Sequence, residues 1–452
     1  MRSNFDPRLL ADFARYYGFH YGVCDPVALV KDLIIEMERG LRGEPSTLPM
    51  LPSYLYPVSS VPPGKTVIAL DAGGTNLRSA LVRFNEQGKA IAENTIKTHM
   101  PGTKGQLSAR AFFDEIAAVT APLLKEHPDV AGIGFCFSYP MEMTKDADGI
   151  LLGFSKEVDA PEVIGKAIGA GLRDALARQG VSAPERIVLL NDTVATLLSG
   201  LAEIPADGGQ RKGPDVYAVE AGPVIGFILG TGMNVAYPET HIPKIGFEDP
   251  QNPQIVVCEM GSFRTRYTGR LDEEFDATTK NPGKYTFEKT MAGAYLGPLT
   301  LYMLKKAVQD GVLVFRRSQE LLAMETLQTK DLNAFMHNPL TGEGPIGSLF
   351  DRDERDALAT LVFLTSIITE RAALFAAATV AAAVEKIKAG YDPFVPVRIA
   401  VEGTTYMIYK GMRPALESYL HTMLANKAPR SVVISPVEQA SLFGAAVAAL
   451  SK

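Results

Sequence analysis

Two apolar stretches of this chain end in glycine–threonine turns, and this repeated pattern constrains the fold more than any other feature. The first stretch is ALDAGGTNLRSALV, from residue 69, and the second is GFILGTGMNVAY, from residue 226. Glycines let the backbone turn with positive φ and bring bare amides close to an anion. A strand, a glycine turn and a second strand therefore occur twice, which predicts two α/β units with one phosphate-binding loop each.

The remaining sequence supplies helices and strands around these two turns. The expected helices span 24–42, ended by Gly43, about 108–126, 161–180, most of 286–390, and a short alanine-rich stretch at the C-terminus. The expected strands are 67–71, 77–84, 186–192, 397–403 and 431–434, with further strands in VIGFILG, NVAY and IVVCEM. Apolar runs bounded by turn residues are typical of such buried strands. We expect a boundary near Asn191 and a cleft between the two domains, where one ligand can touch both.

Composition excludes several classes of protein. A length of 452 residues suggests two or three packed units. The net charge of −6, with no basic block to offset it, argues against a nucleic-acid partner. The cysteines, Cys24, Cys136 and Cys258, are scattered and form no CxxC pair, so a disulfide framework and a cysteine-rich zinc site are both disfavoured.

No segment indicates export or a membrane span. The first residues, MRSNFDPRLLADFARYY, interrupt their apolar positions with charges, unlike a secretory signal. The most apolar region, 357–389, is split by Glu370 and Arg371 into runs too short to cross a bilayer. We expect a buried core helix or helix pair there, no membrane partner, and a soluble protein in the cytoplasm.

The first turn combines anion-binding groups with an acid. The donors are, in chain order, Gly73, Gly74, Thr75, Asn76 and Arg78, and Asp71 precedes them at the end of the strand. An acid beside phosphate donors indicates a cation between them, and Mg²⁺ held through waters is the usual answer. A plain hairpin with a tight turn is the structural alternative.

The second turn places Thr231 between Gly230 and Gly232, again after an apolar strand. Two such turns favour phosphate binding over two coincidental hairpins. The segment 64–66, Gly-Lys-Thr, resembles the end of a P-loop, but Ser59 stands where the first glycine should be. It also precedes a strand instead of following one, so it is not a P-loop.

Between the turns lies RIVLLNDTVATLLSG, in which Asp192 follows a buried strand and opens a helix. A carboxylate at such a junction can take the proton of an attacking hydroxyl during phosphoryl transfer. The same position is also common for an N-cap aspartate, and this residue alone does not decide between the two roles.

Further polar side chains occur near other strand ends and near glycines, and together with Asp192 they form a candidate site. They occur in GFCFSYP (134–140) and ILLGFSK (150–156), and at Asn234, Glu259 and Glu288. Buried polar groups need partners, and a polyol supplies many at once. Lys156 is the cation of this group and is placed to face a migrating phosphoryl oxygen.

The ordered set of motifs resembles the hexokinase family, including the eukaryotic-type glucokinases. The set comprises ALDAGGTNLR, GFCFSYP, GILLGFSK, LLNDTVAT, ILGTGMNVAY, CEMGSF, NPGKYTFEKTMAGAYLGP and AVEGTTY. The resemblance covers residues 25 to 450. It implies two actin-like, ribonuclease H-like α/β domains with a sugar-binding cleft between them. The implied small domain is 60–190 plus about 436–452, and the implied large domain is 1–59 plus 191–435.

The resemblance also implies a role for each matching residue. It makes Asp192 the general base, with Lys156 and Arg78 as further catalytic residues. The implied sugar ligands are Ser138, Ser155, Lys156, Asn191, Asp192, Asn234, Glu259 and Glu288. The implied nucleotide ligands are Asp71, Gly73, Gly74, Thr75, Asn76, Arg78, Thr231, Gly403 and Thr404. The implied reaction is ATP-dependent phosphorylation of a hexose, with glucose at its 6-hydroxyl as the expected substrate and glycolysis as the destination. Mg²⁺ is expected to accompany ATP, near Asp71 and through water, without a dedicated protein site.

Some positions depart from the family pattern. Residues 153–158, GFSKEV, stand where Asn-Trp-Thr-Lys-Gly-Phe is common, and Met260 replaces a tryptophan in a chain with none. Glu402 replaces a usual aspartate, and residues 440–444, ASLFG, stand where Gly-Ser-Gly-x-Gly is common. These departures leave the preferred hexose and the phosphoryl donor open.

Three other classes share part of the pattern. A non-catalytic sugar sensor has no need of Asp192, Lys156 and Arg78. An actin-like or chaperone-like ATPase shares the phosphate turns but not the FSYP, NDT and EKTMAGAYLG groups. A bacterial sugar kinase with a structural zinc is not supported by dispersed cysteines. Oligomeric state and regulation are not determined by these motifs.

Overall fold

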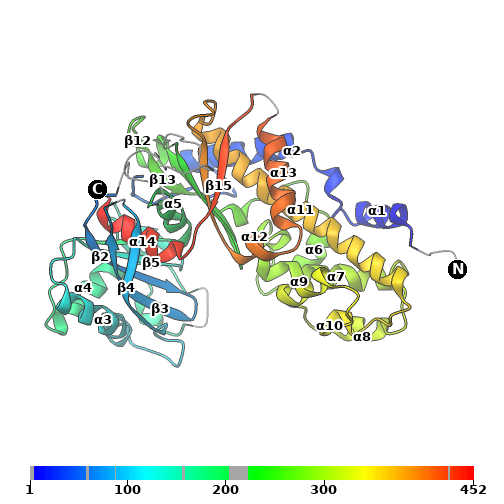
Figure 1. Cartoon of the computed structure of the whole chain (residues 1–452), viewed down its shortest axis with the longest axis horizontal. Coiled ribbons are helices and arrows are strands. Elements are labelled where there is room, and N and C mark those ends of the chain that lie inside the picture. The colour runs from blue at the N-terminus through cyan, green and yellow to red at the C-terminus, as the bar shows by residue number, and fades with distance from the viewer. Residues whose placement is uncertain are drawn as a thin grey trace.

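The computed structural model describes residues 5–57, 61–86, 88–154, 158–202, 222–425 and 428–451. The chain forms two lobes, each built around its own β-sheet, and the lobe with the C-terminal sheet is much richer in helices (Figure 1).

The first sheet has five strands in the order β4-β3-β2-β5-β8. Its strands are β2 (Thr66–Gly73), β3 (Asn76–Phe84), β4 (Ala90–His99), β5 (Ile133–Phe137) and β8 (Ile187–Leu190). The first three form an antiparallel meander, and β5 and then β8 extend the sheet in parallel with β2. The hairpin expected at the first glycine turn is confirmed.

The second sheet repeats this arrangement with one added strand, in the order β1-β13-β10-β9-β14-β15. Its strands are β1 (Leu51–Pro52), β9 (Val224–Leu229), β10 (Met233–Glu239), β13 (Gln254–Val257), β14 (Val397–Glu402) and β15 (Val432–Pro436). Again three strands form an antiparallel meander, and two more continue in parallel. Smaller pairs are β6 (Met141–Met143) with β7 (Gly149–Leu151), and β11 (His241–Ile242) with β12 (Phe247–Glu248).

Both faces of the first sheet are covered. Residues such as Ile68 and Leu70 pack with α3 (Ala109–Glu126) and α4 (Ile168–Arg178), whereas Val67 and Ala69 pack toward α14 (Ala440–Leu450). Successive side chains of a strand point to opposite faces, so an unbroken apolar strand requires a cover on each side.

The two sheets meet through a pair of helices. Helix α14 lies on the first sheet, and α5 (Asp192–Ala202) lies on β9 and β14 of the second, while α5 and α14 pack against each other. Their approach is close, because a Cβ added to Gly444 would lie 2.0 Å from the carbonyl oxygen of Ala195. One added to Gly226 would lie 2.5 Å from that of Thr193.

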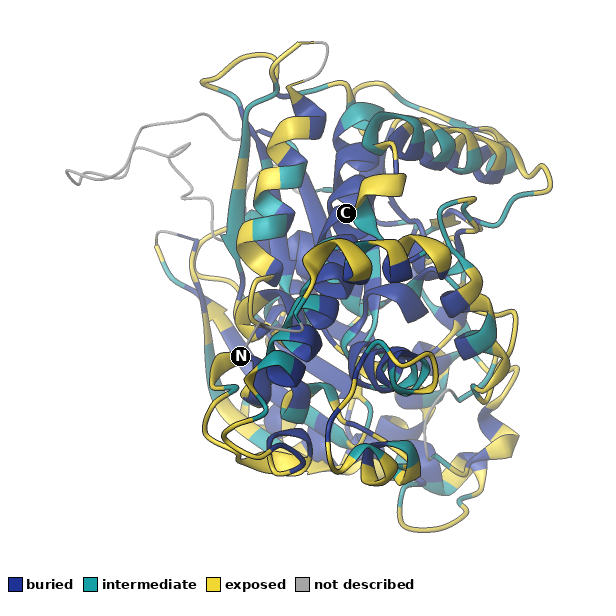
Figure 2. Cartoon of the chain, turned by 90° about the vertical axis from the view of Figure 1, so that its right-hand side faces the viewer, coloured by how far each residue is buried: buried dark blue, intermediate teal, exposed yellow. Residues whose placement is uncertain are grey.

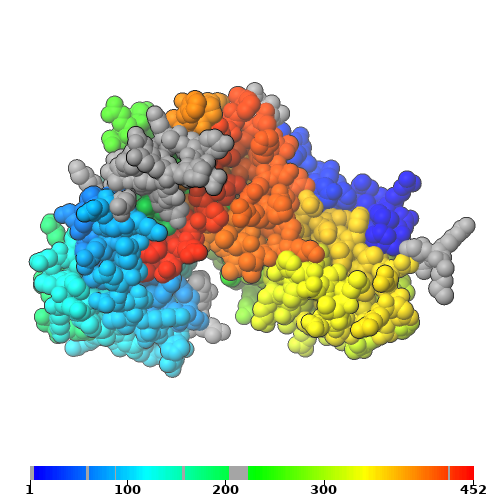
Figure 3. All heavy atoms as spheres, viewed as in Figure 1, coloured from blue at the N-terminus to red at the C-terminus, as the bar shows by residue number. Residues whose placement is uncertain are grey.

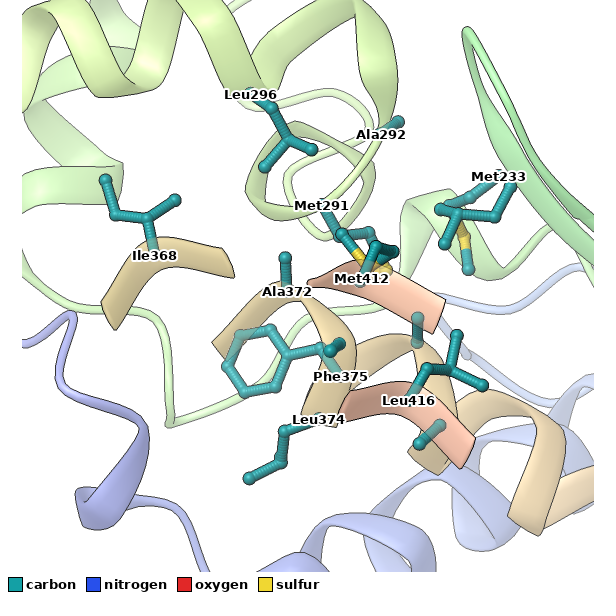
Figure 4. Packing of buried hydrophobic residues seen from close by; sticks show 14 of the residues in the cluster. Met233, Met291, Ala292, Leu296, Ile368, Ala372, Leu374, Phe375, Met412 and Leu416 are labelled. Carbon is teal, nitrogen blue, oxygen red and sulfur yellow. The ribbon is translucent and has the colours of Figure 1, made fainter. Parts of the chain in front are cut away.

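The remaining helices of the second lobe are α1 (Pro7–Tyr16), α2 (Pro26–Arg42), α6 (Arg270–Ala277), α7 (Gly293–Gln309), α8 (Ser318–Ala323), α9 (Thr329–His337), α10 (Gly344–Gly347), α11 (Arg355–Ile387), α12 (Thr404–Ile408) and α13 (Met412–Leu424). Of these, α1, α2, α7 and α13 pack on the long helix α11. Phe375 of α11 stacks on Phe287 with 5.2 Å between ring centroids. Figure 4 shows Met291 and residues Met412 and Leu416 of α13 next to α11, and all of them belong to one buried cluster.

Helix α2 ends at the expected residue, Arg42, but begins at Pro26, two residues after the expected start. Asp25 accepts bonds from the amides of Val27 and Ala28, and Gly43 ends the helix with φ 72°. Glycine suits this left-handed position because it has no Cβ. Helix α1 was not predicted.

The expected single helix over 161–180 is wrong. A short 3₁₀ turn occupies Pro161–Val163, and the α-helix begins only at Ile168. Gly165 adopts φ 81°, which breaks the helical path, and Asp148 accepts bonds from the amides of Gly169 and Ala170 at the true start of α4. This distant cap was not visible in the local sequence.

Almost all of the apolar region 357–389 lies in one continuous helix, α11, which ends at Ile387, so the region forms a buried core helix and not a helix pair. Within the described part of the chain, only this helix is long and apolar enough to cross a membrane, and 78% of its apolar window is buried inside the protein. Figure 2 shows exposed residues on peripheral helices and loops, with the central strands buried. Arg371, which interrupts the apolar run, pairs with Asp272 of α6.

Candidate active site

The space-filling view shows a hollow between the two lobes (Figure 3). Predicted site residues come from the ends of strands in both sheets: β2 and β8 in the first, β9 and β14 in the second. In parallel-stranded α/β sheets, ligands bind beyond the carboxyl ends of the strands.

At the start of α5, Asn191 caps the helix and Asp192 is its first residue. The Asn191 side-chain oxygen accepts a bond from the amide of Val194 at 2.8 Å, so Asn191 is the N-cap. Asp192 is the first helical residue, and its carboxylate accepts a bond from the Thr193 hydroxyl at 3.2 Å. The N-cap role considered for Asp192 is therefore filled by its neighbour.

Glu259 and Asn234 form a bonded pair beside the cleft. The Asn234 amide donates to Glu259 Oε1 at 2.8 Å, and its own oxygen accepts from the amides of Val235 at 2.8 Å and Met260 at 3.3 Å. Glu259 lies directly after β13 with φ 56°, a left-handed conformation that is uncommon for glutamate. Such strain persists only where the surroundings fix it, and it concentrates at functional sites.

Glu288 approaches the same place from the short 3₁₀ turn Glu288–Thr290. Its Oε2 accepts a bond from the amide of Met233 at 3.0 Å. Two glycines leave room for it: a Cβ added to Gly232 would lie 2.9 Å from Glu288 Oε2, and one added to Gly261 would lie 3.1 Å from Glu288 Cβ. The second glycine turn thus shapes the pocket of this carboxylate.

The carboxylates of the cleft act on one another electrostatically. Burial raises the pKa of Glu259 to about 7, and the charges of Asp192 and Glu288 add to this shift against the bond from Asn234. Burial also raises the pKa of Glu288, with a further contribution from Asp192. Asp192, Glu259 and Glu288 therefore lie in one shared environment, although they come from α5, the end of β13 and a 3₁₀ turn. Groups of this kind with raised pKa values mark functional sites.

Glu402, at the end of β14, belongs to the same cleft. Burial and the charges of Asp192 and Asp71 raise the pKa of Glu402 to about 6, and its Oε2 accepts a bond from Thr196 at 3.5 Å. The sequence identified Glu402 only as a departure from a usual aspartate. Its nearness to Asp71 and Asp192 is decided by the packing of the two sheets.

In the first phosphate turn, Asp71 and Arg78 pair with each other across the hairpin. Arg78 Nε donates to Asp71 Oδ2 at 2.9 Å, and Arg78 Nη2 also contacts Asp71 Oδ2 and reaches Ser441 of α14 at 3.4 Å. Asp71 Oδ1 lies on the other side, where a Cβ added to Gly73 would be 3.6 Å from it and 3.8 Å from the Ser138 hydroxyl. The guanidinium of Arg78, which was expected to face phosphate, is therefore held in an ion pair with Asp71.

The rest of that turn faces solvent. Gly73 and Thr75 are exposed, Gly74 and Asn76 are partly exposed, and Gly74 adopts φ 73°. The turn therefore offers amides and hydroxyls to solvent, as a phosphate-binding loop must.

The second turn packs against the start of α7. The carbonyl of Gly230 accepts bonds from the Gly293 amide at 2.8 Å and the Thr405 hydroxyl at 2.8 Å, and Thr231 accepts from Ala294 at 3.0 Å. Gly403, with φ 126°, lies so close that a Cβ there would be 2.3 Å from the Leu229 carbonyl oxygen. Only glycine fits at this approach of β14 to β9.

A pocket of about 380 Å³ opens beside this turn. The predicted nucleotide residues Thr231 and Thr404 both line it. The sequence did not identify its remaining wall, which is Gly293, Ala294, Pro298, Thr326, Leu327, Gln328, Thr329, Lys330, Asn333, Thr405, Ile408 and Tyr409. These residues come from α7, from α9 and the loop before it, and from α12 and the residue after it. The motifs that begin at residues 281 and 400 include the residues of α7 and Thr405, whereas the residues in and before α9 belong to no motif, so packing brings the wall together.

Two predicted residues, Ser155 and Lys156, lie outside the described residues. Their roles stay predictions. Within the described ranges, no group of three or more histidine, cysteine, aspartate or glutamate side chains is placed to hold a metal ion directly.

Comparison with known proteins decides the family. Two hexokinase family models match residues 19–202 and 224–451 of this chain. Hexokinase-1 from Oryza sativa subsp. japonica is 30% identical over 446 residues, which cover 92% of this chain and 85% of the relative. The chain belongs to the hexokinase family. As a hexokinase-family enzyme, it carries out ATP-dependent phosphorylation of a hexose.

Further relatives and solved structures agree. Hexokinase-2 from Candida albicans is 29% identical over 457 residues, covering 93% of this chain and 88% of that one. A hexokinase from Schistosoma mansoni, solved in complex with glucose, superposes with a TM-score of 0.75 at 22% identity, covering 98% of this chain and 99% of that one. This likeness confirms the expected actin-like α/β fold.

Proposed function

We propose that this hexokinase-family enzyme transfers the γ-phosphoryl group of ATP to the 6-hydroxyl of glucose, with Asp192 as the general base. The observation that carries the proposal is the convergence of Asp192, Glu259 and Glu288 from three separate elements into one electrostatic environment. A cluster of acceptors at a cleft suits a ligand with many hydroxyl donors.

In the proposed reaction, the 6-oxygen of the sugar forms a bond to the γ-phosphorus while the bond from that phosphorus to the bridging oxygen of ADP breaks. The hydroxyl proton passes to the Asp192 carboxylate. Because Asn191 caps α5, the Asp192 carboxylate is not required for the cap and can serve this role. Positioning and electrostatic stabilisation supply most of the catalysis in such transfers.

The remaining sugar hydroxyls would be held by Asn191, Asn234, Glu259, Glu288 and Ser138. Asn234 and Glu259 are already oriented by their mutual bond, so their lone pairs and donors are preorganised for the sugar. Ser155 and Lys156 complete the predicted set; we propose that Lys156 stabilises the charge that develops on the transferring phosphoryl group.

The nucleotide would span the cleft. Its phosphates would meet the amides and hydroxyls of the first turn and Thr231 of the second, and its adenosine would occupy the pocket beside Thr404. Mg²⁺ bound by ATP would neutralise phosphate charge. The residues fit such an ion, since Asp71 and Glu402 come from the two different sheets yet lie close enough for the Asp71 charge to raise the pKa of Glu402. Mg²⁺ commonly keeps several waters between itself and protein carboxylates.

The two lobes would act as domains, with 60–190 plus about 436–452 as the small one and the remainder as the large one. The placement of α14 on the first sheet supports this division. We further propose that the partners are small molecules, without nucleic acid or membrane, that the enzyme works in the cytoplasm, and that its product feeds glycolysis.

A coupled assay with ATP and Mg²⁺ tests the proposal directly. Glucose, fructose, mannose and glucosamine are compared as acceptors, and the phosphorylated position is identified in each product. We expect glucose to be phosphorylated at its 6-hydroxyl with the highest kcat/KM. Preference for another hexose would overturn the substrate assignment, and nucleotide hydrolysis without sugar transfer would favour a plain ATPase.

A further inference from the structure

Tyr139 lies between two segments that the proposed function assigns to different substrates. It follows β5, where the Ser138 amide donates to the Ala72 carbonyl at 3.1 Å, next to the first phosphate turn. On its other side, the Pro140 carbonyl accepts a bond from the Leu152 amide at 2.9 Å. We call residues 149–154 the sugar-side segment, because they lead directly into the predicted sugar ligands.

The Tyr139 hydroxyl reaches the phosphate turn. It donates a bond to the Gly74 carbonyl oxygen at 3.0 Å. In a planar trans peptide, this carbonyl and the amide N–H of Thr75 point in opposite directions. Fixing the Gly74 oxygen therefore aims the Thr75 amide away from Tyr139. The peptide after Thr75 is fixed as well, because its carbonyl accepts from the Met100 amide at 2.9 Å.

The hydrogen bond from Tyr139 matters because Gly74 leaves the backbone of the turn free to rotate. Its φ is 73°, and glycine populates positive and negative φ about equally. The peptide between Gly74 and Thr75 can therefore rotate at low cost unless another group holds it. The Tyr139 hydroxyl is such a group, acting from beneath the turn.

The Tyr139 ring contacts the sugar-side segment. Its centroid lies 5.2 Å from that of Phe154 in an edge-to-face arrangement, and 4.9 Å from that of Phe137. Phe154 packs in turn on Phe112 of α3, at 5.7 Å. Tyr139 is only 4% exposed, and burial raises its pKa to about 12, so the hydroxyl stays protonated and able to donate.

We propose that Tyr139 is a positioning residue that couples the sugar-side segment to the first phosphate turn. A sugar that seats residues 149–154 fixes Phe154, Phe154 fixes the Tyr139 ring, and the Tyr139 hydroxyl holds the Gly74 peptide so that the Thr75 amide faces phosphate. The proposal rests on the proposed function, because it takes the glycine turn as a nucleotide ligand and the sugar-side segment as part of the hexose site.

Tyr139→Phe tests the hydroxyl while keeping the ring. We expect kcat/KM for MgATP to fall by roughly 5- to 30-fold, because one buried carbonyl loses its partner and the turn loses its orientation. Binding of glucose alone, measured by calorimetry, should not change. The matched control is Tyr17→Phe, which removes a hydroxyl donating to Asp310 at 2.9 Å from a side chain that is 3% exposed and remote from the cleft. Its kinetics should equal those of the wild type.

A double-mutant cycle tests the coupling. Phe154→Leu keeps the Tyr139 hydroxyl but removes the edge-to-face contact, and we expect it to weaken both glucose binding and kcat/KM for MgATP. In the Tyr139→Phe background, Phe154→Leu should have little further effect on kcat/KM for MgATP. The reason is that the hydrogen bond from Tyr139 to Gly74, through which Phe154 would act, is already missing. Additive effects would overturn the coupling.

Two other results would overturn the positioning role itself. An unchanged kcat/KM for MgATP in Tyr139→Phe would show that the hydroxyl does not orient the turn. Equal losses for both substrates, with a lower melting temperature, would indicate a purely structural contact. Binding of a non-hydrolysable ATP analogue with Mg²⁺ separates this proposal from the proposed function. Weaker analogue binding in Tyr139→Phe supports the role of Tyr139 even if the wild type were to phosphorylate no hexose.

Discussion

At the start of α5, the cap and the proposed base are adjacent residues. Asn191 satisfies the Val194 amide through its side chain, and Asp192 begins the helix. Replacing Asp192 therefore leaves the helix cap intact. This separation makes the base assignment testable without loss of the fold.

We expect Asp192→Asn to lower kcat by roughly 10²- to 10⁴-fold, the range for loss of a positioned base. The amide has the shape of the carboxylate, so the melting temperature and the affinity for glucose should change little. Steady-state kinetics together with glucose titration check both points. Near-full turnover in the variant would show that another group takes the proton.

Glu259 links sugar binding to stability. Its pKa is raised from 4.5 to about 7, mainly by burial. Between these pH values the folded protein keeps a proton that the unfolded chain has released, so the contribution of Glu259 to stability falls as pH rises through this window. Above pH 7 the folded protein carries the full cost of a desolvated charge.

Glu259→Gln should remove that cost. We expect the variant to be more stable than the wild type at pH 8 by about 1–3 kcal/mol, a range that allows for partial exposure of Glu259 to the cleft, with a smaller difference near pH 5. Its KM for glucose should rise about tenfold, because a charged acceptor is lost, while KM for ATP changes less. Denaturant unfolding at both pH values and steady-state kinetics provide the measurements. A stability gain that does not depend on pH would contradict the assigned titration.

At the scale of elements, α11 organises the large lobe around a buried ion pair. Arg371 Nη1 and Nη2 donate to the two Asp272 oxygens, each at 2.7 Å, and the Arg371 side chain is 1% exposed. Asp272 also accepts the Gly269 amide at the start of α6. Helix α6 then reaches the catalytic side, because Asp276 binds Lys289, the neighbour of Glu288, at 2.5 Å.

Arg371→Met should therefore destabilise the protein by about 3–5 kcal/mol, since it strands a buried carboxylate. The double variant Arg371→Met with Asp272→Asn should recover part of this loss, because no unpaired charge remains. The midpoint of urea unfolding gives the comparison. Equal midpoints for the single and double variants would show that the stranded charge is not the cause.

At the scale of the molecule, the lobes meet mainly through α5 and α14. Glycines allow the close packing of these helices on each other and on the second sheet. The hollow of Figure 3 lies between the lobes. The proposed ligands of each substrate come from elements of both lobes. A sugar that contacts both lobes should draw them together as a hinge closure.

We expect the radius of gyration, measured by solution X-ray scattering, to fall when glucose is added and not when nucleotide alone is added. Asp192→Asn is the control, since it should bind sugar and close without turnover. Closure also excludes water from the nucleotide. Slow ATP hydrolysis should consequently rise with xylose, which fills most of the pocket but lacks the carbon that bears the accepting hydroxyl. An unchanged scattering curve at saturating glucose, or brisk hydrolysis without any sugar, would contradict closure.

The sequence predicted those parts of the protein that local chemistry specifies. The glycines at 73 and 74 require a turn, Gly43 ends α2, and the unbroken apolar runs of β2 and β8 require cover on both faces. Asp192 was placed at a strand–helix junction from its flanking residues alone. These features depend on backbone conformation and burial within a few residues, and tertiary context did not alter them.

The tertiary structure decided what depends on residues far apart in the chain. The structure shows that Asn191 is the N-cap of α5 and that Arg78 forms an ion pair with Asp71. It also shows that the helix expected over 161–180 is interrupted at Gly165, and that Tyr139 lies between two loops. It also formed the pocket beside Thr404 from α7, α9 with the loop before it, and α12, which are far apart in the chain. Hydrogen bonds and charges act over a few ångströms in space, so the partners of a side chain follow from packing and not from its neighbours in sequence.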